Sequence, residues 1–286
     1  MASTKVFAFG TDLWDPSHRF QTSWLVSPYV LFAVRATISV YAFFTLLFEI
    51  GFQCAHPELG GCAASRDSFS YFTVLTYWGI AFYAAVAAAH TFAYARRGAA
   101  PLDAWPRPLQ ALHSLYYTTV VTFPFIVTVV YWGVLYAGSF ATRFAAWGNV
   151  SEHAFNSVFA LAEILLPRTA PMPWLHVLWL IVLLALYLAL AYLTRATKGF
   201  YTYDFLDPDV TGPYVAAYVF GIAVAAIIVF VVVWSVVRAR LWLTETKLGM
   251  GGKFAYAGDR RRDNYVRDEE DQFEMSSGSP VPIAQK

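Results

Sequence analysis

The chain has 286 residues, of which 58% are hydrophobic and only 14% are charged. A soluble domain carries about 25% charged residues, so this composition excludes an ordinary water-soluble fold and indicates an integral membrane protein. The net charge of +1 gives no indication of nucleic acid binding. No motif identifies a protein partner.

Six apolar stretches are long enough to cross a bilayer. A helix needs about 20 residues to span the hydrocarbon layer, and it satisfies its own backbone hydrogen bonds there. We therefore predict an all-α integral membrane protein with six transmembrane helices, at residues 29–52, 70–94, 112–137, 150–166, 174–193 and 214–237. The fourth is the weakest, because it is short and contains Glu152, His153, Asn156 and Glu163. Hydropathy alone also allows it to be a re-entrant or interfacial segment.

The distribution of Lys and Arg predicts the orientation, since basic residues accumulate in cytosolic loops. With six crossings and a cytosolic amino terminus, fifteen basic residues lie on the cytosolic side and four on the other. Arg35, near the cytosolic end of the first helix, can extend its guanidinium group to the membrane surface. Without a crossing by the fourth segment, the basic carboxyl-terminal region would lie outside.

Both termini are therefore predicted to be cytosolic. We expect a cytosolic amino-terminal segment at residues 1–28, a six-helix transmembrane domain at 29–240 and a disordered cytosolic tail at 241–286. The expected compartment is the endoplasmic reticulum or another endomembrane, with the plasma membrane as the alternative. Cys54 and Cys62 both fall in the first non-cytosolic loop, where we favour a local disulfide over two free thiols.

Polar side chains at membrane depth are candidates for a functional site, because their burial in lipid is costly. The second and fourth helices begin on the same side, and Thr73 and His153 each lie three residues inside their helix. Asn149 and Ser157 lie four residues before and after His153, so the three share one helix face, with Asn156 beside them. We predict that Thr73 and this polar stripe lie at similar depth and can be neighbours.

A hydroxyl group paired with an imidazole suits nucleophilic acyl transfer, and a membrane setting suits a lipid ester. Either Asn149 or Asn156 could fix the histidine tautomer or donate to an oxyanion. The loop at 195–213 opens on the same side and offers Tyr203 and Asp204 as an orienting shell. The structural alternative stays open, because threonines in membrane helices commonly bond to their own backbone. Glu163 is equally compatible with helix packing and with proton handling.

Three ordered blocks resemble the androgen-induced and androgen-dependent family of multi-pass membrane threonine hydrolases, in a fungal-type version with a long tail. The first is Tyr71-Phe72-Thr73-Val74-Leu75-Thr76, which is similar to the family's Leu-Thr-Phe-Ile-Asn/Asp stretch. The second is Asn149-Val-Ser-Glu-His153, similar to its Asn-x-x-x-His, with a glutamate ten residues later at Glu163. The third runs from Thr197 to Asp207 and is similar to its Thr-Gly-x-Trp-x-Tyr-Pro-Phe-Leu-Glu loop.

The resemblance implies a six-span hydrolase of fatty acid esters of hydroxy fatty acids, without a metal or an organic cofactor. It implies Thr73 as the nucleophile and His153 as the general base. Thr76 stands where the family has an acidic or amide residue, which leaves it as an alternative nucleophile. We expect a lipid-accessible pocket among the second to fifth helices. The rival hypothesis is a non-catalytic lipid-binding, transport or scaffold protein of the same topology.

Overall fold

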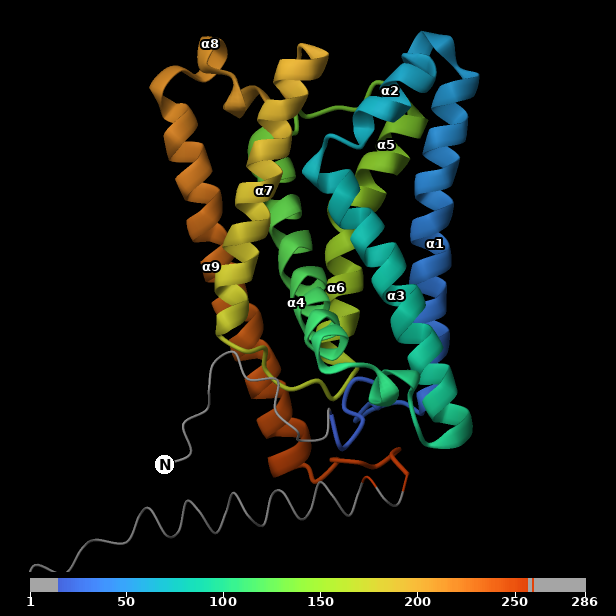
Figure 1. Ribbon diagram of the computed structural model, residues 1–286. Helices are drawn as coiled ribbons and strands as arrows, with labels where there is room; N and C mark the ends of the chain where they lie inside the picture. Colours follow the sequence, from blue (N-terminus) through green and yellow to red (C-terminus); the bar gives the residue numbers. More distant parts are fainter. Residues whose placement is uncertain (1–14, 257–258, 260–286) are drawn as a thin grey trace, which may run out of the picture.

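The computed structural model describes residues 15–256 and 259. Within these residues the regular secondary structure is entirely helical. Shorter 3₁₀ and π turns connect or extend the α-helices (Figure 1). The α-helices are α1 Pro28–Ala55, α2 Gly61–Ser68, α3 Phe72–Arg97, α4 Arg107–Val130, α5 Arg143–Val150, α6 Asn156–Leu165, α7 Leu175–Lys198, α8 Pro208–Thr211 and α9 Val215–Leu241. The turns are η1 Pro57–Leu59, η2 Pro101–Ala104, η3 Tyr131–Leu135, η4 Ser151–Phe155, η5 Asp204–Leu206, η6 Gly212–Tyr214 and η7 Trp242–Lys247.

Five helical stretches within the described residues are long and apolar enough to cross a membrane. They are Pro28–Ala55, Phe72–Arg97, Arg107–Leu135, Leu175–Lys198 and Pro208–Lys247. Each contains or closely matches a stretch predicted from the sequence, so five of the six predicted spans are confirmed at this level. The fourth predicted span falls in a helical run from Arg143 to Leu165 that the π turn η4 divides into α5 and α6.

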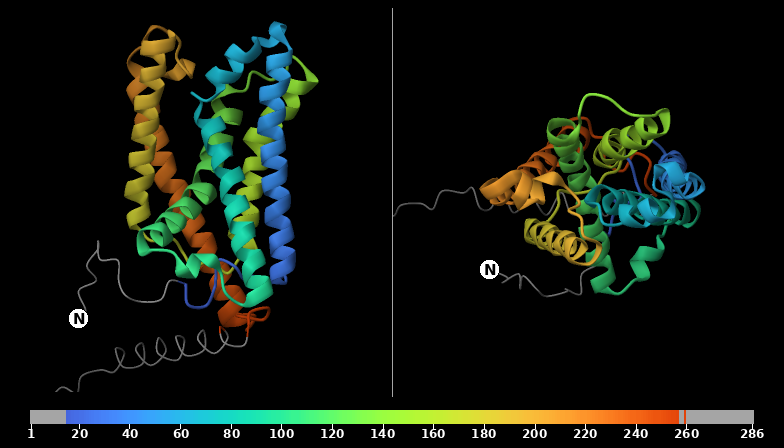
Figure 2. Two further views of the ribbon diagram at one scale, coloured as in Figure 1. Left: turned by 45° about the vertical axis from the view of Figure 1, so that its right-hand side comes forward. Right: turned by 90° about the horizontal axis from the view of Figure 1, so that it is seen from above.

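The long helices form one bundle in which α4 holds the central position. Helix α1 packs along α3, and α4 contacts α3, α6, α7 and α9. Seen from above, α7 and α9 lie at one side of the bundle and α1 with α3 at the other (Figure 2). In the most apolar 18 residues of the spans that contain α7 and α9, only 17% of the residues are buried, against 39–44% in the other three spans. These two helices therefore present most of their surface to the surroundings.

Local chemistry accounts for several helix ends. Helix α1 begins where Ser27 accepts a hydrogen bond from the Val30 amide and Pro28 occupies the first turn, a position where a missing N–H costs nothing. Helices α3 and α7 end at Gly98 and Gly199, whose φ angles of 70° and 83° lie in the left-handed region that favours glycine.

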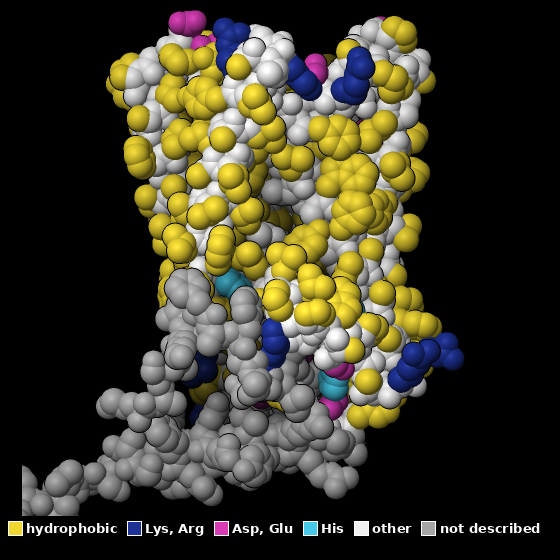
Figure 3. Space-filling view, viewed as in Figure 1, with side chains coloured by type: hydrophobic (Ala, Val, Ile, Leu, Met, Phe, Trp, Pro, Cys, Tyr) yellow, Lys and Arg dark blue, Asp and Glu magenta, His cyan; other side chains and the backbone are white. Residues whose placement is uncertain are grey.

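The surface is divided into an apolar middle and two polar ends. Hydrophobic side chains cover the body of the bundle, whereas Lys, Arg, Asp and Glu gather at its top and bottom (Figure 3). Large side chains such as Val40, Leu186, Phe220 and Ile228 are more than half exposed. An exposed apolar band between charged rims is the surface that a lipid bilayer requires.

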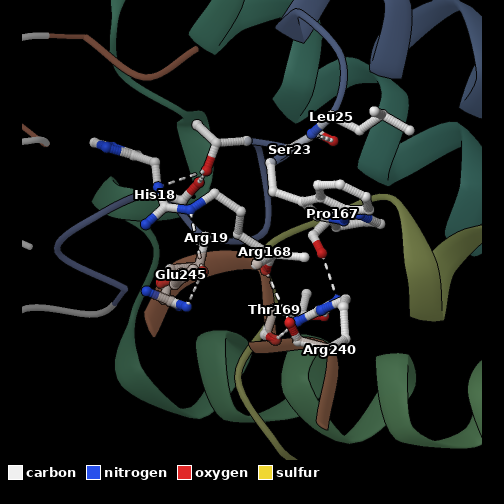
Figure 4. A network of polar contacts seen from close by, with 12 residues as sticks. His18, Arg19, Ser23, Leu25, Pro167, Arg168, Thr169, Arg240 and Glu245 are labelled. Carbon is white, nitrogen blue, oxygen red and sulfur yellow. Dashed lines mark hydrogen bonds and ion pairs between the residues drawn. The ribbon is translucent and has the colours of Figure 1, made fainter. Parts of the chain in front are cut away.

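A polar network at the lower end ties the first described segment to the region after α9 (Figure 4). Arg19 Nη2 lies 2.6 Å from Glu245 Oε1, and Arg168 Nε lies 3.3 Å from the same oxygen. His18 Nε2 lies 2.8 Å from Asp103 Oδ2. These ion pairs join segments far apart in the sequence at the lower end of the bundle. We call this group of residues, His18, Arg19, Asp103, Arg168 and Glu245, the base of the bundle.

Residues 242–256, the first part of the predicted disordered tail, are structured. Residues 242–247 continue α9 as the π turn η7, and the Tyr256 hydroxyl donates to the carbonyl of Ala95 at 3.0 Å. The ordering follows from the partners that Glu245 and Tyr256 find on the bundle. Most of the remainder of the predicted tail, residues 257–258 and 260–286, lies outside the described residues, as does the predicted amino-terminal segment up to residue 14.

Arg35 does not extend to the membrane surface as predicted. Its side chain is only 1% exposed and forms two hydrogen bonds of 2.7 Å with the Glu163 carboxylate, from Nε to Oε1 and from Nη2 to Oε2. Arg35 Nη1 also donates to the Phe20 carbonyl at 2.7 Å and to Thr91 Oγ1 at 2.6 Å. A buried opposite charge at the same depth holds the guanidinium group inside the bundle.

The first loop at the upper end is closed by a covalent link. The sulfur atoms of Cys54 and Cys62 lie 2.01 Å apart and form a disulfide. It connects the end of α1 to α2 and so fixes the short connection that leads into α3.

Candidate active site

An apolar cavity of about 300 Å³ opens among α3, α4, α7 and α9. Its polar lining groups are the hydroxyls of Thr73, Tyr131, Tyr187 and Tyr203, set among Leu, Ile, Val, Ala and Phe side chains. The surface is also hollowed between α7 and α3 in the space-filling view (Figure 3). The sequence predicted a pocket among the second to fifth helices, but α9 and the loop before it replace the fourth predicted span in the lining. This apolar lining suits an acyl chain better than a polar ligand.

Thr73 lies in the first turn of α3, at the cavity wall, with 8% of its surface exposed. Its hydroxyl is within hydrogen-bonding reach of Tyr203, and the backbone amide of Phe72 donates to the Tyr203 oxygen at 3.1 Å. The start of α3 supplies that amide, since the first N–H groups of a helix have no partner within it.

Tyr203 brings a second hydroxyl to the same wall. Burial raises its pKa, and hydrogen bonds with Thr73, Tyr187 and the Phe72 and Thr73 amides act in the opposite direction. Since the oxygen accepts from Phe72, the phenolic proton is available to donate into the cavity. The Tyr187 hydroxyl fixes the position of this corner, since it donates to the Ser70 carbonyl at 3.1 Å and lies 3.3 Å from the Thr202 hydroxyl.

His153 lies in the π turn η4, outside the cavity wall, and contacts a residue that lines it. Its ring stacks on Tyr131, a lining residue, with ring centroids 3.6 Å apart and planes 19° apart. His153 Nδ1 lies 2.9 Å from the carbonyl oxygen of Asn149. A carbonyl can only accept, so in the neutral ring Nδ1 carries the proton and Nε2 keeps its lone pair. Nε2 has no hydrogen-bond partner among the described residues.

The two predicted catalytic residues lie on elements that pack together, but no hydrogen bond joins their side chains within the described residues. The π turn that carries His153 packs against α3, which carries Thr73, and against α4. Tyr131 is the side chain that links them, because it contacts the histidine ring and lines the cavity with Thr73.

Neither predicted asparagine contacts the His153 ring through its side-chain amide. Asn149 Nδ2 donates to the Ala145 carbonyl at 2.8 Å, and only the Asn149 backbone oxygen reaches the ring. Asn156 is 2% exposed and points to α4, where its Nδ2 donates to the Pro124 carbonyl at 3.3 Å and its Oδ1 accepts from Thr128 at 3.1 Å. Asn156 therefore joins two helices.

Three further predicted site residues lie away from the Thr73 hydroxyl. Thr76 donates to the Thr73 carbonyl at 2.9 Å and lines a different depression, between α3, α4 and α7. Asp204 is exposed at the end of the bundle. Glu163 is bound to Arg35 in the core and lines no part of the apolar cavity.

Sequence reasoning missed Tyr131 and Tyr187 as residues of this site. Tyr131 lies one turn after the apolar centre of the third predicted span, and nothing in its immediate pattern distinguishes it from an interfacial tyrosine. Tyr187 is the one polar side chain in a run of Leu, Ile, Val and Ala from 180 to 191. That isolation was the available signal.

The described residues contain no group of three or more His, Cys, Asp or Glu side chains arranged to hold a metal ion. The cavity wall carries hydroxyl groups in an apolar setting, and the His153 imidazole lies against one of them, Tyr131. A search of protein-family models, curated proteins and solved structures finds no match to the chain.

Proposed function

We propose that the chain is a membrane-embedded lipid ester hydrolase with six spans and both termini in the cytosol, in the endoplasmic reticulum or another endomembrane. The observation that carries the proposal is the apolar cavity with the Thr73 hydroxyl in its wall and an unpartnered His153 Nε2 behind it. The resemblance to the membrane threonine hydrolases suggests fatty acid esters of hydroxy fatty acids as substrates.

The sixth span in this proposal is the helical run from Arg143 to Leu165. Its crossing places the basic residues that follow α9 in the cytosol, in agreement with the positive-inside rule. Its buried polar side chains face other helices: Glu163 is paired with Arg35, and Asn156 with α4. Pairing of this kind makes polar residues tolerable at membrane depth.

The reaction uses groups on the two walls. The Thr73 hydroxyl gives its proton to His153 Nε2 while its oxygen bonds to the ester carbonyl carbon, and the tetrahedral oxyanion accepts a hydrogen bond from Tyr203. The carbon–oxygen bond to the alcohol then breaks, and His153 returns the proton to the leaving alkoxide. Water attacks the acyl-threonine by the same route, which releases the fatty acid and restores Thr73.

Proton transfer from Thr73 to His153 requires the π turn or Tyr131 to move when substrate binds. Catalytic hydrogen bonds are often long in unliganded enzymes and tighten in the Michaelis complex. The second candidate function, a non-catalytic lipid-binding protein, is favoured by the lack of a hydrogen bond between Thr73 and His153 within the described residues. It uses the same cavity as a holding site for an acyl chain.

The two candidates separate on turnover. Purified protein in detergent or nanodiscs is given a fatty acid ester of a hydroxy fatty acid, and the released acid is quantified. Thr73→Ala and His153→Ala are expected to lose activity by roughly 10²–10⁴-fold, whereas Thr73→Ser retains part of it. Thr76→Ala is the matched control, because its hydroxyl bonds only to the backbone and faces another depression.

Folding of each variant is checked by gel filtration and thermal unfolding. Full activity in Thr73→Ala would refute the assignment of the nucleophile. No turnover of any lipid ester by folded wild-type protein would favour the lipid-binding candidate.

A further inference from the structure

A second polar cluster lies in the upper half of the bundle, where α1, α3 and the π turn η4 meet. Thr45 and Glu49 share one face of α1 because they are four residues apart. Tyr77 comes from α3, and Glu152 from η4. None of these four residues lines the apolar cavity.

The two carboxyl groups of this cluster face each other. Glu49 Oε1 packs against Gly148, which lies one helical turn before Glu152 in the same helical run, so the two carboxyl groups come close together, and Glu152 is 8% exposed. Ionised carboxylates only accept hydrogen bonds, so a contact between them requires a proton or another cation. No Lys, Arg or His contacts either group among the described residues, and the adjacent His153 is turned toward Tyr131.

Unpartnered oxygens surround the pair. Thr45 Oγ1, Tyr77 OH and Glu152 Oε1 are all buried and have no hydrogen-bond partner of standard geometry within the described structure. Thr45 is fully buried and Tyr77 is 1% exposed, and the Tyr77 hydroxyl lies beside Thr45 and within electrostatic range of Glu49 and Glu152. Buried polar atoms are almost always paired, so this set of oxygens calls for an occupant that they can bind together.

Gly148 makes room for the cluster. A Cβ atom built at Gly148 would overlap Glu49 Oε1, so only glycine allows the Glu49 carboxyl group to occupy its position beside α5. The Tyr41 hydroxyl lies 2.7 Å from Ser151 Oγ and closes the same side of the cluster without using the unpartnered oxygens.

We propose that Thr45, Glu49, Tyr77 and Glu152 form a binding site for one small monovalent cation, a proton or a sodium ion, between α1, α3 and η4. Oxygen-only ligands suit hard cations, and a bound positive charge offsets the cost of burying two carboxyl groups. The proposal does not depend on the hydrolase activity, because the site and the cavity share no residue.

Thermal unfolding of the full chain in detergent tests the proposal and separates the two cations. In the sodium arm, Na⁺ replaces N-methylglucamine at constant ionic strength. Sodium binding is expected to raise the wild-type Tm by about 5 °C at saturation, with no rise in Glu152→Gln or Glu49→Gln. Glu58→Gln, which removes an exposed carboxylate from the loop after α1, is the matched control and keeps the wild-type response.

In the proton arm, unfolding is followed without sodium from about pH 5 to about pH 9. A folded state that holds the shared proton to higher pH than the unfolded chain loses stability as pH rises. The wild-type Tm should therefore fall across this range, and the fall should be smaller in Glu152→Gln, which mimics the protonated group; His18 lies far from this cluster and contributes equally to both proteins.

Gly148→Ala tests the site without changing any charge. The added methyl group displaces only the flexible end of Glu49, and alanine favours the helix, so the protein should fold while its sodium response is lost or its fall in Tm with pH is reduced. A wild-type Tm that responds to neither cation, or responses that are unchanged in all three site variants, would overturn the proposal.

Discussion

The buried ion pair between Arg35 and Glu163 gives the sharpest stability prediction. Glu163→Gln keeps the shape of the side chain but removes its charge, which leaves a guanidinium group that is 1% exposed without its counter-charge. Breaking a buried pair from one side costs about 3–5 kcal/mol. For a domain of this size that corresponds to a fall in Tm of roughly 10 °C.

The assay is thermal unfolding in detergent, with the exposed ion pair between Lys198 and Asp67 as the control. That pair is just as short, at 2.8 Å, but its side chains are 39% and 42% exposed. Asp67→Asn should therefore cost less than about 1 kcal/mol. Replacing both Arg35 and Glu163 by leucine should recover most of the loss, because no buried charge then remains. Equal effects of Glu163→Gln and Asp67→Asn would refute the reasoning. Loss of turnover in folded Glu163→Gln would instead revive a proton-handling role.

Three further predictions follow from single contacts. Asn149→Ala should change ester hydrolysis by less than about threefold, because the backbone oxygen of Asn149 holds His153; a loss as large as that of His153→Ala would contradict this. Burial lowers the pKa of His18, but the hydrogen bond to Asp103 and a second carboxylate outweigh it and raise the value from 6.5 to about 10. The stability that His18 contributes is thus complete below pH 6.5 and is lost as pH rises to about 10, so the Tm of His18→Gln should fall less over this interval. Cys54→Ser opens a disulfide with a sequence separation of 8 residues and should lower the unfolding free energy by about 2.5 kcal/mol, whereas an unchanged Tm in reducing and oxidising buffer would argue against this contribution.

The helical architecture could be predicted because hydrophobic length is a local property. The start of α7 lies within one residue of the predicted start at 174, and α9 begins at Val215 against a predicted 214. The division of the fourth predicted span by η4 could not be predicted in this way. A π turn depends on where the backbone finds tertiary partners, and hydropathy does not encode this.

Contacts between side chains of different helices were harder to predict. Their similar depth in the membrane predicted that Thr73 and His153 lie on neighbouring helices. Depth does not give the rotation of a helix about its axis, which here turns the His153 ring onto Tyr131. The same depth argument applied to Arg35 and Glu163 would have paired them, since both lie inside predicted spans near the same membrane face. Lining of the cavity by α9 depended on helix packing, which a single sequence leaves open.

The ion pair between Arg19 and Glu245 joins positions 226 residues apart in the chain, and this has a consequence for biosynthesis. The segment that precedes α1 leaves the ribosome first, yet its partner is synthesised only after α9. Until then, the early segment cannot make this contact, so completion of the base is a late event in assembly. A chain that stops before Glu245 can still contain all of the helices that line the cavity. It lacks the Glu245 carboxylate, which pairs with Arg19 and with Arg168 in the full chain.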